Sequence, residues 1–173
     1  MMRDGEFKAM QGFMAFVDHV HPYVPARAQS FGIRSGMTVV DYGCGPGRYT
    51  AEFARLVGDD GAVYAVDLLD IALEQTEKRL VKLGVCNVSL VKAEGYDTGI
   101  PDGVADMVCA IDMIHHIDDV PTLLREISRI SKPGAALLFS GGHMSRRAVK
   151  AKVSAGGAWR LVEEQKHFLR YEK

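Results

Sequence analysis

Short apolar runs alternate along the chain with longer segments whose apolar residues recur at helical spacing. Five runs rich in Val, Ile, Leu and Ala predict buried strands over residues 38–42, 62–66, 88–92, 105–111 and 135–140. Between them, apolar residues three and four positions apart predict helices over 48–57, 70–83 and 121–131. A helix over 146–154 and a closing pair of strands over 159–164 and 167–172 complete the pattern.

The N-terminal residues do not follow this alternation. Helical spacing predicts a helix over 7–20, which Pro22 and Pro25 end, and a second short helix over 25–31. No repeat, low-complexity run or linker divides the rest of the sequence. We therefore expect an N-terminal helical segment that acts as a cap, residues 1–31, and a single ligand-binding domain, residues 32–173.

Several predicted strands are apolar throughout rather than alternately apolar and polar. This is typical of a sheet that helices cover on both faces. The pattern predicts an α/β fold of the Rossmann-like, doubly wound kind, with a mostly parallel, seven-stranded sheet and an antiparallel strand near the C-terminus. In such sheets, ligands bind beyond the carboxyl ends of the strands, where the winding direction reverses. We expect the functional residues at that edge.

A glycine-rich turn stands where the first strand should pass into a helix. The segment from Asp41 to Arg48 reads D-Y-G-C-G-P-G-R. Glycine allows positive φ and has no Cβ, so the backbone can turn sharply and lie close to a ligand. A purely structural turn is the alternative. The even spacing differs from the G-x-G-x-x-G of dinucleotide sites, and Asp41 would repel a pyrophosphate but attract an ammonium, which disfavours a nicotinamide-dependent oxidoreductase.

Two carboxylates follow at the ends of the next two strands. Asp67 ends the second strand about 20 residues past the turn, where a carboxylate can accept hydrogen bonds from ribose hydroxyls. Glu94 follows the third strand, where it could accept a hydrogen bond from an adenine amino group. Either residue alone could be a helix cap or a solvated side chain. Together with the turn, they predict a nucleoside-binding edge.

With these residues the sequence resembles the class I S-adenosylmethionine-dependent methyltransferases, and most closely the small-molecule enzymes of the ubiquinone-biosynthesis type. The resemblance begins with the D-x-G-C-G-P-G turn and continues through residues 66–68, 92–95, 100–108, 113–117 and 130–135. It implies that residues 32–173 bind S-adenosylmethionine as cofactor and transfer its methyl group to an acceptor, which we expect to be a small molecule. A cofactor-binding regulatory or scaffold protein without catalysis is the alternative.

The resemblance also implies a role for each matching residue. Asp41 would bind the amino end of the methionine, directly or through water, and Asp67 would bind the ribose hydroxyls. The turn would pass beneath the methionine and the ribose. Leu68, Ala93 and Glu94 would surround the adenine, and Ile111 would offer its carbonyl towards the cofactor. The implied cofactor-binding residues are Asp41, Gly43, Cys44, Gly45, Gly47, Asp67, Leu68, Ala93, Glu94 and Ile111. Glu94 replaces the more usual Asp and keeps the acceptor oxygen.

The sequence does not identify a catalytic residue. Methyl transfer from a sulfonium mainly requires alignment of the reactants and exclusion of water, an effect of up to about 7–11 kcal/mol. Asp112 and His116 follow the fourth strand and are the candidates for a general base if the acceptor must lose a proton. Packing at a helix start is the alternative for both residues. Tyr23 would either close over the cofactor or pack on the sheet.

Composition and charge narrow the possible partners. The chain is 47% hydrophobic and 25% charged with a net charge of −1, which favours a globular domain and disfavours nucleic acid as a partner. The segment 141–173, however, holds eight Lys and Arg against three Asp and Glu. This excess of positive charge is either a solvated face or a basic rim that attracts an anionic acceptor.

The cysteines and the apolar runs indicate where the protein works. Cys44, Cys86 and Cys109 are scattered, which argues against a disulfide framework and against structural zinc. No apolar run reaches the roughly 18 residues that a membrane helix needs, and residues 1–20 do not look like a signal peptide. We therefore expect a cytoplasmic location, no bound metal and no membrane association, and we leave a homo-oligomer open.

Overall fold

The computed structural model describes residues 23–142, 144–154 and 158–173, so the helix predicted over 7–20 lies outside the described residues. The sheet is built from β1 (Thr38–Tyr42), β2 (Ala62–Asp67), β3 (Val88–Lys92), β4 (Ala105–Ala110), β5 (Ser131–Phe139), β6 (Arg160–Glu164) and β7 (Leu169–Glu172). The helices are α2 (Tyr23–Gln29), α3 (Arg48–Val57), α4 (Asp70–Leu83), α5 (Val120–Ile130) and α6 (Arg146–Ser154), with a 3₁₀ turn, η1, at Ile114–His116.

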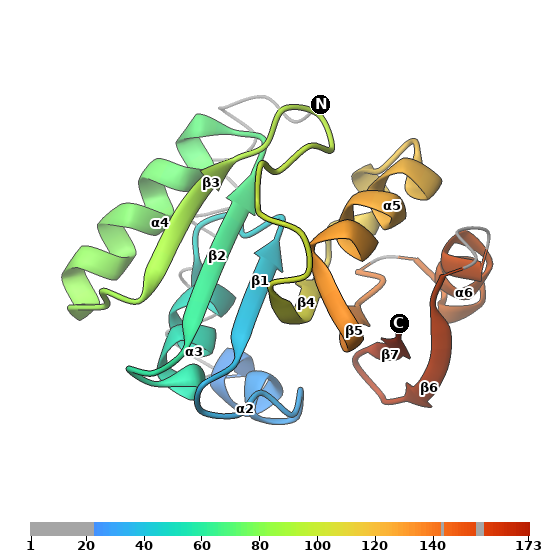
Figure 1. The fold of residues 1–173 in the computed structure, drawn as a ribbon, viewed down its shortest axis with the longest axis horizontal. Helices are drawn as coiled ribbons and strands as arrows, with labels where there is room; N and C mark the ends of the chain where they lie inside the picture. The colour runs from blue at the N-terminus through green and yellow to red at the C-terminus, as the bar shows by residue number, and fades with distance from the viewer. Residues whose placement is uncertain (1–22, 143, 155–157) are drawn as a thin grey trace.

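The seven strands form one sheet in the order β3-β2-β1-β4-β5-β7-β6. Parallel pairing joins β1 to β2 and β4, β2 to β3, and β4 to β5. Strand β7 runs antiparallel to both of its neighbours, β5 and β6, and these strands lie with α6 at one end of the molecule (Figure 1). The predicted α/β fold, with its mostly parallel sheet and an antiparallel strand near the C-terminus, is therefore confirmed.

Neighbouring strand residues pack into different layers. On β1, Val40 packs in a core cluster with Leu123 of α5 and Val149 of α6. The adjacent Val39 packs in a second cluster with Phe31 and with Phe53 of α3. Each of these side chains is at most 1% exposed. Because helices cover both faces of the sheet, both sides of each central strand are apolar, which explains the continuous apolar runs in the sequence.

Several predicted boundaries differ from the structure at element ends. Helix α5 begins at Val120, because the Asp119 carboxylate accepts a hydrogen bond from the Thr122 backbone N–H at 3.0 Å and caps the helix. Strand β4 ends at Ala110 rather than at residue 111, and two residues later Asp112 adopts a φ of 56°, which turns the chain away. Strand β5 already begins at Ser131, which pairs with Ala105 ahead of a register shift.

The two ends of the described chain differ from the predictions in a similar way. The short helix predicted over 25–31 begins at Tyr23 and ends at Gln29, and the closing strands β6 and β7 are shorter than predicted. Phe31, just after α2, is completely buried and stacks on Tyr49 with ring centroids 5.9 Å apart. Helix α2 is therefore fixed to the sheet domain through this aromatic contact.

Within the described residues, no helix combines the length and the apolar character that crossing a bilayer requires. The longest of these helices, α4, has 14 residues.

Candidate functional site

A cleft of about 1000 Å³ lies at the carboxyl ends of the strands. Its lining includes the turn after β1, the end of β2, the loops after β3 and β4, and the segment that leads from β5 into α6. Strand β1 is followed along the sheet by β4, so the winding direction reverses between these two strands. The cleft therefore occupies the place where an open α/β sheet binds its ligand.

The backbone N–H groups of the glycine turn are all used within the protein. Gly43 and Cys44 both donate to the Val66 carbonyl, at 2.8 and 2.9 Å, and Gly47 donates to the Cys44 carbonyl at 3.1 Å. Gly45 donates to the Asp67 carboxylate at 2.9 Å. A dinucleotide site binds the pyrophosphate with free N–H groups at such a turn. This turn has no such free N–H group, and the carboxylates of Asp41 and Asp67 line the cleft beside it, which suits a cationic ligand.

The three glycines of the turn have different surroundings. All three have positive φ: 79° at Gly43, 54° at Gly45 and 71° at Gly47. A Cβ built on Gly45 would meet no atom within 4 Å, so the backbone of this residue faces open space in the cleft. A Cβ on Gly47 would lie 2.8 Å from two side-chain atoms of Thr76. Gly47 does not line the cleft; it lets the turn pack closely against α4.

Asp41, at the end of β1, lines the cleft and is 2% exposed. Its carboxylate accepts a hydrogen bond of 2.6 Å from the Thr50 hydroxyl of α3. The pKa of this carboxyl is raised to about 7, mainly because burial removes the hydration of the ionised form; the hydrogen bond from Thr50 opposes the rise and the nearby Asp67 adds to it. A buried carboxylate with one neutral partner attracts a positively charged group strongly.

Asp67 connects the end of β2 to the glycine turn. One carboxylate oxygen accepts from Gly45 N at 2.9 Å, and the other accepts from Leu69 N at 3.0 Å. Each oxygen can accept a second hydrogen bond, so the carboxylate can still bind a ligand hydroxyl from the cleft. The neighbouring Leu68 also lines the cleft and is 46% exposed, which leaves an apolar surface beside Asp67.

The segment after β3 differs from the expectation at one residue. Ala93 is buried and lines the cleft, as does Gly95. Glu94 lies between them but is exposed and outside the lining, and its backbone forms an isolated bridge with Asp97. Glu94 therefore does not contribute to the lining that its two neighbours help to form.

The far side of the cleft begins at the end of β4. Ile111 is buried in its lining, and Asp112 follows with the positive φ already noted. The Asp112 carboxylate accepts a hydrogen bond from the Ser140 hydroxyl, and its other oxygen lies 3.5 Å from Nη1 of Arg27. Asp112 is therefore held by Ser140, the residue that follows β5, and by Arg27 of α2.

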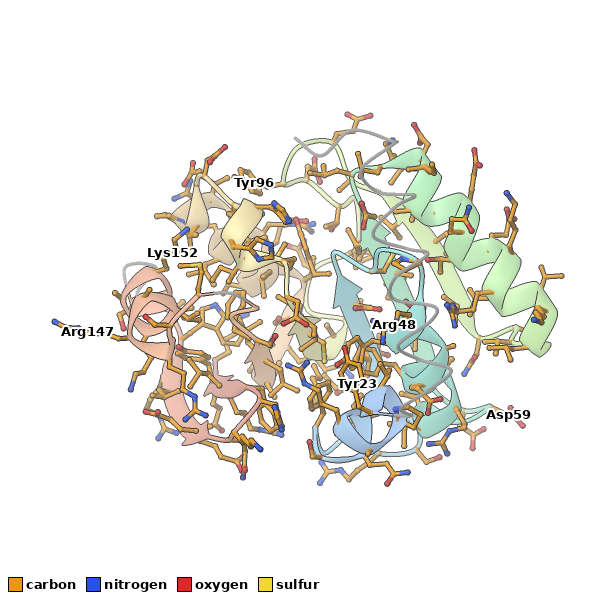
Figure 2. All side chains as sticks on the ribbon, turned by 180° about the vertical axis from the view of Figure 1, so that it is seen from behind. Tyr23, Arg48, Asp59, Tyr96, Arg147 and Lys152 are labelled. Carbon is orange, nitrogen blue, oxygen red and sulfur yellow. The ribbon has the colours of Figure 1, made fainter. Side chains whose placement is uncertain are left out.

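His115 and His116 of η1 both line this side of the cleft, with ring centroids 3.9 Å apart. His116 is exposed. Tyr23 lines the cleft at 39% exposure rather than packing on the sheet, and the guanidinium carbon of Arg48 lies 5.3 Å from the centre of its ring. Figure 2 shows these two labelled side chains close together. Asp112 and His116 thus share one region of the cleft.

The structure brings together eight of the ten residues predicted to bind the cofactor, because Gly47 and Glu94 alone lie outside the lining. Cys44 is buried, and burial raises the pKa of its thiol well above the usual value, so it stays an unreactive thiol. Among the described residues, no group of three or more His, Cys, Asp or Glu side chains is arranged to hold a metal ion.

Besides Arg48, which follows the glycine turn, the cleft is lined by three basic residues that sequence reasoning missed: Arg27, Arg146 and Lys166. They come from α2, the start of α6 and the β6–β7 turn, so only the tertiary fold brings them together. Arg27 donates a 2.6 Å hydrogen bond from Nη2 to the His167 carbonyl, 140 positions away in the sequence. The excess of positive charge in residues 141–173 was the one sequence signal for Arg146 and Lys166, and it does not include Arg27.

Comparison with known proteins identifies the family of this chain. The family model of the methyltransferase domain matches residues 40–139, more than half of the chain. The chain therefore belongs to the methyltransferase domain family, in its class I S-adenosylmethionine-dependent branch. Its curated relatives include the ubiquinone/menaquinone biosynthesis C-methyltransferase UbiE of Enterobacter sp. (strain 638), 36% identical over 108 residues that make up 62% of this chain. The aligned part is 43% of that relative, so the chain spans less than half of its length.

Solved structures support the same family. An S-adenosylmethionine-dependent methyltransferase from Aquifex aeolicus superposes with a TM-score of 0.75 at 27% identity, covering 86% of this chain and 87% of that one. An S-adenosylmethionine-dependent methyltransferase from Methanococcus maripaludis, so described provisionally, gives a TM-score of 0.82 at 19% identity over 100% of this chain and 97% of the other. The second similarity shows the fold alone.

The residues present fit S-adenosylmethionine, the cofactor of this family. Its methionine ammonium and its sulfonium are positive, and the turn presents two carboxylates, Asp41 and Asp67, with no free N–H group. Its adenine and ribose need an apolar surface and hydroxyl acceptors, which Leu68 and Asp67 provide next to each other. The open space at Gly45 leaves room for a ligand directly against the backbone.

Proposed function

We propose that this protein transfers the methyl group of S-adenosylmethionine to a small-molecule acceptor. The observation that carries the proposal is the turn at the carboxyl end of β1, whose N–H groups are all bonded internally while Asp41 and Asp67 face the cleft. The cleft volume of about 1000 Å³ is at the upper end of the usual range for small-molecule sites, about 300–1000 Å³, which leaves room for an acceptor beside the cofactor.

In this proposal each part of the cleft has its own task. Asp41 binds the methionine ammonium, and Asp67 binds the ribose hydroxyls. Gly43, Cys44 and Gly45 pass beneath the methionine and ribose, while Leu68 and Ala93 contact the adenine. Ile111 directs its carbonyl towards the cofactor. Gly47 contributes indirectly by letting the turn pack on Thr76, and Glu94 would reach the adenine only through a movement of its loop.

The cofactor, when bound, supplies a methyl group on a sulfonium, and the C–S bond electrons remain on sulfur as the methyl group bonds to the acceptor. The protein aligns the acceptor and excludes water. The buried residues Phe139, Phe168 and Val149 contribute apolar side chains to the lining on the acceptor side. Asp112 or His116 accepts a proton if the acceptor must lose one, and both lie on that side of the cleft.

The remaining expectations from the sequence belong to the same proposal. Residues 1–31 act as a cap for the domain 32–173, which is supported by the presence of Tyr23 and Arg27 in the cleft lining. The protein works in the cytoplasm on a small molecule and does not bind nucleic acid. A homo-oligomer stays open as a prediction that gel filtration with light scattering would test.

A turnover assay tests the proposed function. The protein is incubated with S-adenosylmethionine labelled in the methyl group and with quinone precursors, amines, thiols and peptides, and S-adenosylhomocysteine is measured. We expect release of S-adenosylhomocysteine together with label in one class of small molecule. Binding of the cofactor without turnover on any acceptor would favour a regulatory or scaffold protein and contradict the proposal.

Asp41 gives cofactor binding a pH dependence. The pKa of about 7 means that this carboxyl is mostly protonated at pH 6 and mostly ionised at pH 8. Only the ionised form attracts an ammonium, so the affinity for S-adenosylhomocysteine should rise by up to about tenfold over this range. Calorimetric titrations at the two pH values measure the change, and Asp41→Asn should abolish it. An affinity that is flat or falls would contradict the proposed role.

The same pKa shift predicts the opposite trend for the stability of the ligand-free protein. Between the ordinary pKa of 3.8 and the folded value of about 7, the folded chain holds a proton at Asp41 that the unfolded chain has lost. The contribution of Asp41 to the free energy of unfolding should therefore fall as the pH rises through this window and level off above it. Urea denaturation of the protein and of Asp41→Asn at several pH values isolates this contribution. An unchanged difference between them would contradict the raised pKa.

A further inference from the structure

The main acidic and basic groups of the cleft come from different elements, although Arg48 follows the glycine turn and Asp112 and Asp118 lie between β4 and α5. The carboxylates Asp41 and Asp67 belong to the side formed by β1 and β2. Arg146 and Lys166 line the opposite side, at the start of α6 and in the β6–β7 turn, and Arg27 of α2 reaches this turn through the His167 carbonyl. Since the proposed function places the cofactor at the first side, the basic side is the one that meets the acceptor.

Two arginines connect the basic side to the β6–β7 turn. Arg146 donates from Nη2 to the Lys166 carbonyl at 2.8 Å, and Arg27 donates from Nη2 to the His167 carbonyl at 2.6 Å. Carbonyl acceptors orient a guanidinium but do not neutralise its charge. Arg27 also has Asp112 at 3.5 Å, so its charge is partly compensated. Among the residues that the structure describes, the charge of this region that no carboxylate compensates therefore lies on Arg146 and Lys166.

Other basic residues of the C-terminal segment are bound elsewhere. Lys150 pairs with Glu164 at 2.7 Å, and Arg160 pairs with Glu172 at 2.6 Å. Backbone carbonyls accept hydrogen bonds from Lys152, Arg170 and Lys173. Within residues 23–142, 144–154 and 158–173, by contrast, no carboxylate forms an ion pair with Arg146 or Lys166. Both residues are exposed, so their charge faces the open side of the cleft.

The electrostatics of helix α6 add to this positive charge. The helix begins at Arg146 and has no acidic residue in its first turn. The N-terminal end of a helix carries a partial positive charge, which favours an anion near it. Below these charges the lining is apolar, with Phe139, Phe168 and Val149 each at most 4% exposed. Asp118 is a carboxylate that also lines the cleft, but it belongs to the loop before α5 and not to the first turn of α6.

We propose that the methyl acceptor is an apolar small molecule with an anionic group, a carboxylate or a phosphate, which Arg146 and Lys166 bind at the rim of the cleft. The apolar body lies against Phe168 and Met144, both of which line the cleft. This inference rests on the proposed function, because it assigns the acceptor to the side of the cleft that the cofactor leaves open.

A binding experiment tests this proposal without knowledge of the natural acceptor. The protein is first saturated with S-adenosylhomocysteine, and this step alone tests the cofactor site. The complex is then titrated with matched pairs of a carboxylate and its neutral carboxamide: benzoate and benzamide, 2-naphthoate and 2-naphthamide, and indole-3-acetate and its amide. Phenyl phosphate is compared with phenol to distinguish the two anionic groups.

We expect at least one anion to bind about tenfold more tightly than its neutral partner, with a preference that weakens at high salt. Arg146→Gln and Lys166→Gln should each reduce this preference to less than about threefold. Arg147→Gln is the matched control, since Arg147 is exposed and points away from the molecule (Figure 2). It should leave the preference unchanged.

Three results would overturn the inference. The first is the absence of any preference for an anion in all pairs while S-adenosylhomocysteine binds, which leaves the proposed function intact. The second is an equal loss of preference in Arg147→Gln and Arg146→Gln, which would indicate a general charge effect. The third is a failure of S-adenosylhomocysteine itself to bind, which removes the proposed function and this inference with it.

Discussion

Replacing Asp67 with alanine is expected to weaken the binding of S-adenosylhomocysteine by about 100-fold. Asp67 accepts hydrogen bonds from Gly45 N at 2.9 Å and from Leu69 N at 3.0 Å, and it offers its remaining lone pairs to the cleft. The substitution removes the proposed partner of the ribose hydroxyls and also releases the turn. A 100-fold loss is about 2.7 kcal/mol, and one hydrogen bond to a charged group contributes about 1.5–3 kcal/mol, so the loss of one such bond accounts for the expected change.

Calorimetric titration of the folded variant measures this effect, and Asp70→Ala is the matched control. The Asp70 side chain is 80% exposed, pairs with Lys92 and does not line the cleft, so its loss should change the affinity less than about twofold. Equal affinities for the Asp67→Ala variant and the unmodified protein would contradict the role of Asp67.

Replacing Gly47 with alanine is expected to lower the free energy of unfolding by about 3 kcal/mol. A residue with a Cβ is strained at a φ of 71°, and the new methyl group would lie 2.8 Å from the Cγ2 and Oγ1 atoms of Thr76. Left-handed strain and overpacking each cost about 1–3 kcal/mol. Because Thr76 is fully buried on α4 and cannot move easily, the turn itself must shift. Urea denaturation measures the loss.

Gly45→Ala is the matched control for this stability effect. Gly45 also has a positive φ, 54°, but its Cβ would meet nothing within 4 Å. The substitution should therefore cost only about 1 kcal/mol in stability. Since the new methyl group would occupy the cleft, it should weaken cofactor binding by about tenfold. The same stability loss in both variants would contradict the assigned packing role of Gly47.

A double-mutant cycle separates strain from overpacking at Gly47. In a Thr76→Ala background, the two atoms that the new methyl group at this position would meet most closely are gone. The cost of Gly47→Ala should then fall towards the backbone strain alone, and the difference is the interaction energy of the pair. An unchanged cost in the two backgrounds would mean that the contact with Thr76 does not limit this position.

The core of the fold could be predicted from the sequence because its signals are local. The runs that form β1, β3 and α4 have apolar periodicity and clear ends, such as Gly84 after α4. The start of β5 could not be predicted in this way. Ser131 extends because it pairs with Ala105 of a neighbouring strand, and Pro133 and Gly134 conceal this pairing in the sequence.

The same distinction applies to the site. Asp41 and Asp67 stand at strand ends, so the sequence could bring them to one edge. Glu94 has a similar sequence position but lies outside the cleft lining, and single-residue geometry of this kind has no periodic signal. The contact of Arg27 with the His167 carbonyl joins segments from opposite ends of the chain, which only the packing of α2 creates.

The most direct test of the central claim is a calorimetric titration of the full chain with S-adenosylhomocysteine, and with NAD under the same conditions. The bonded N–H groups of the glycine turn and the carboxylates of Asp41 and Asp67 predict micromolar binding of the first ligand and no measurable heat with the second. Binding of NAD, or no binding of S-adenosylhomocysteine, would contradict the account.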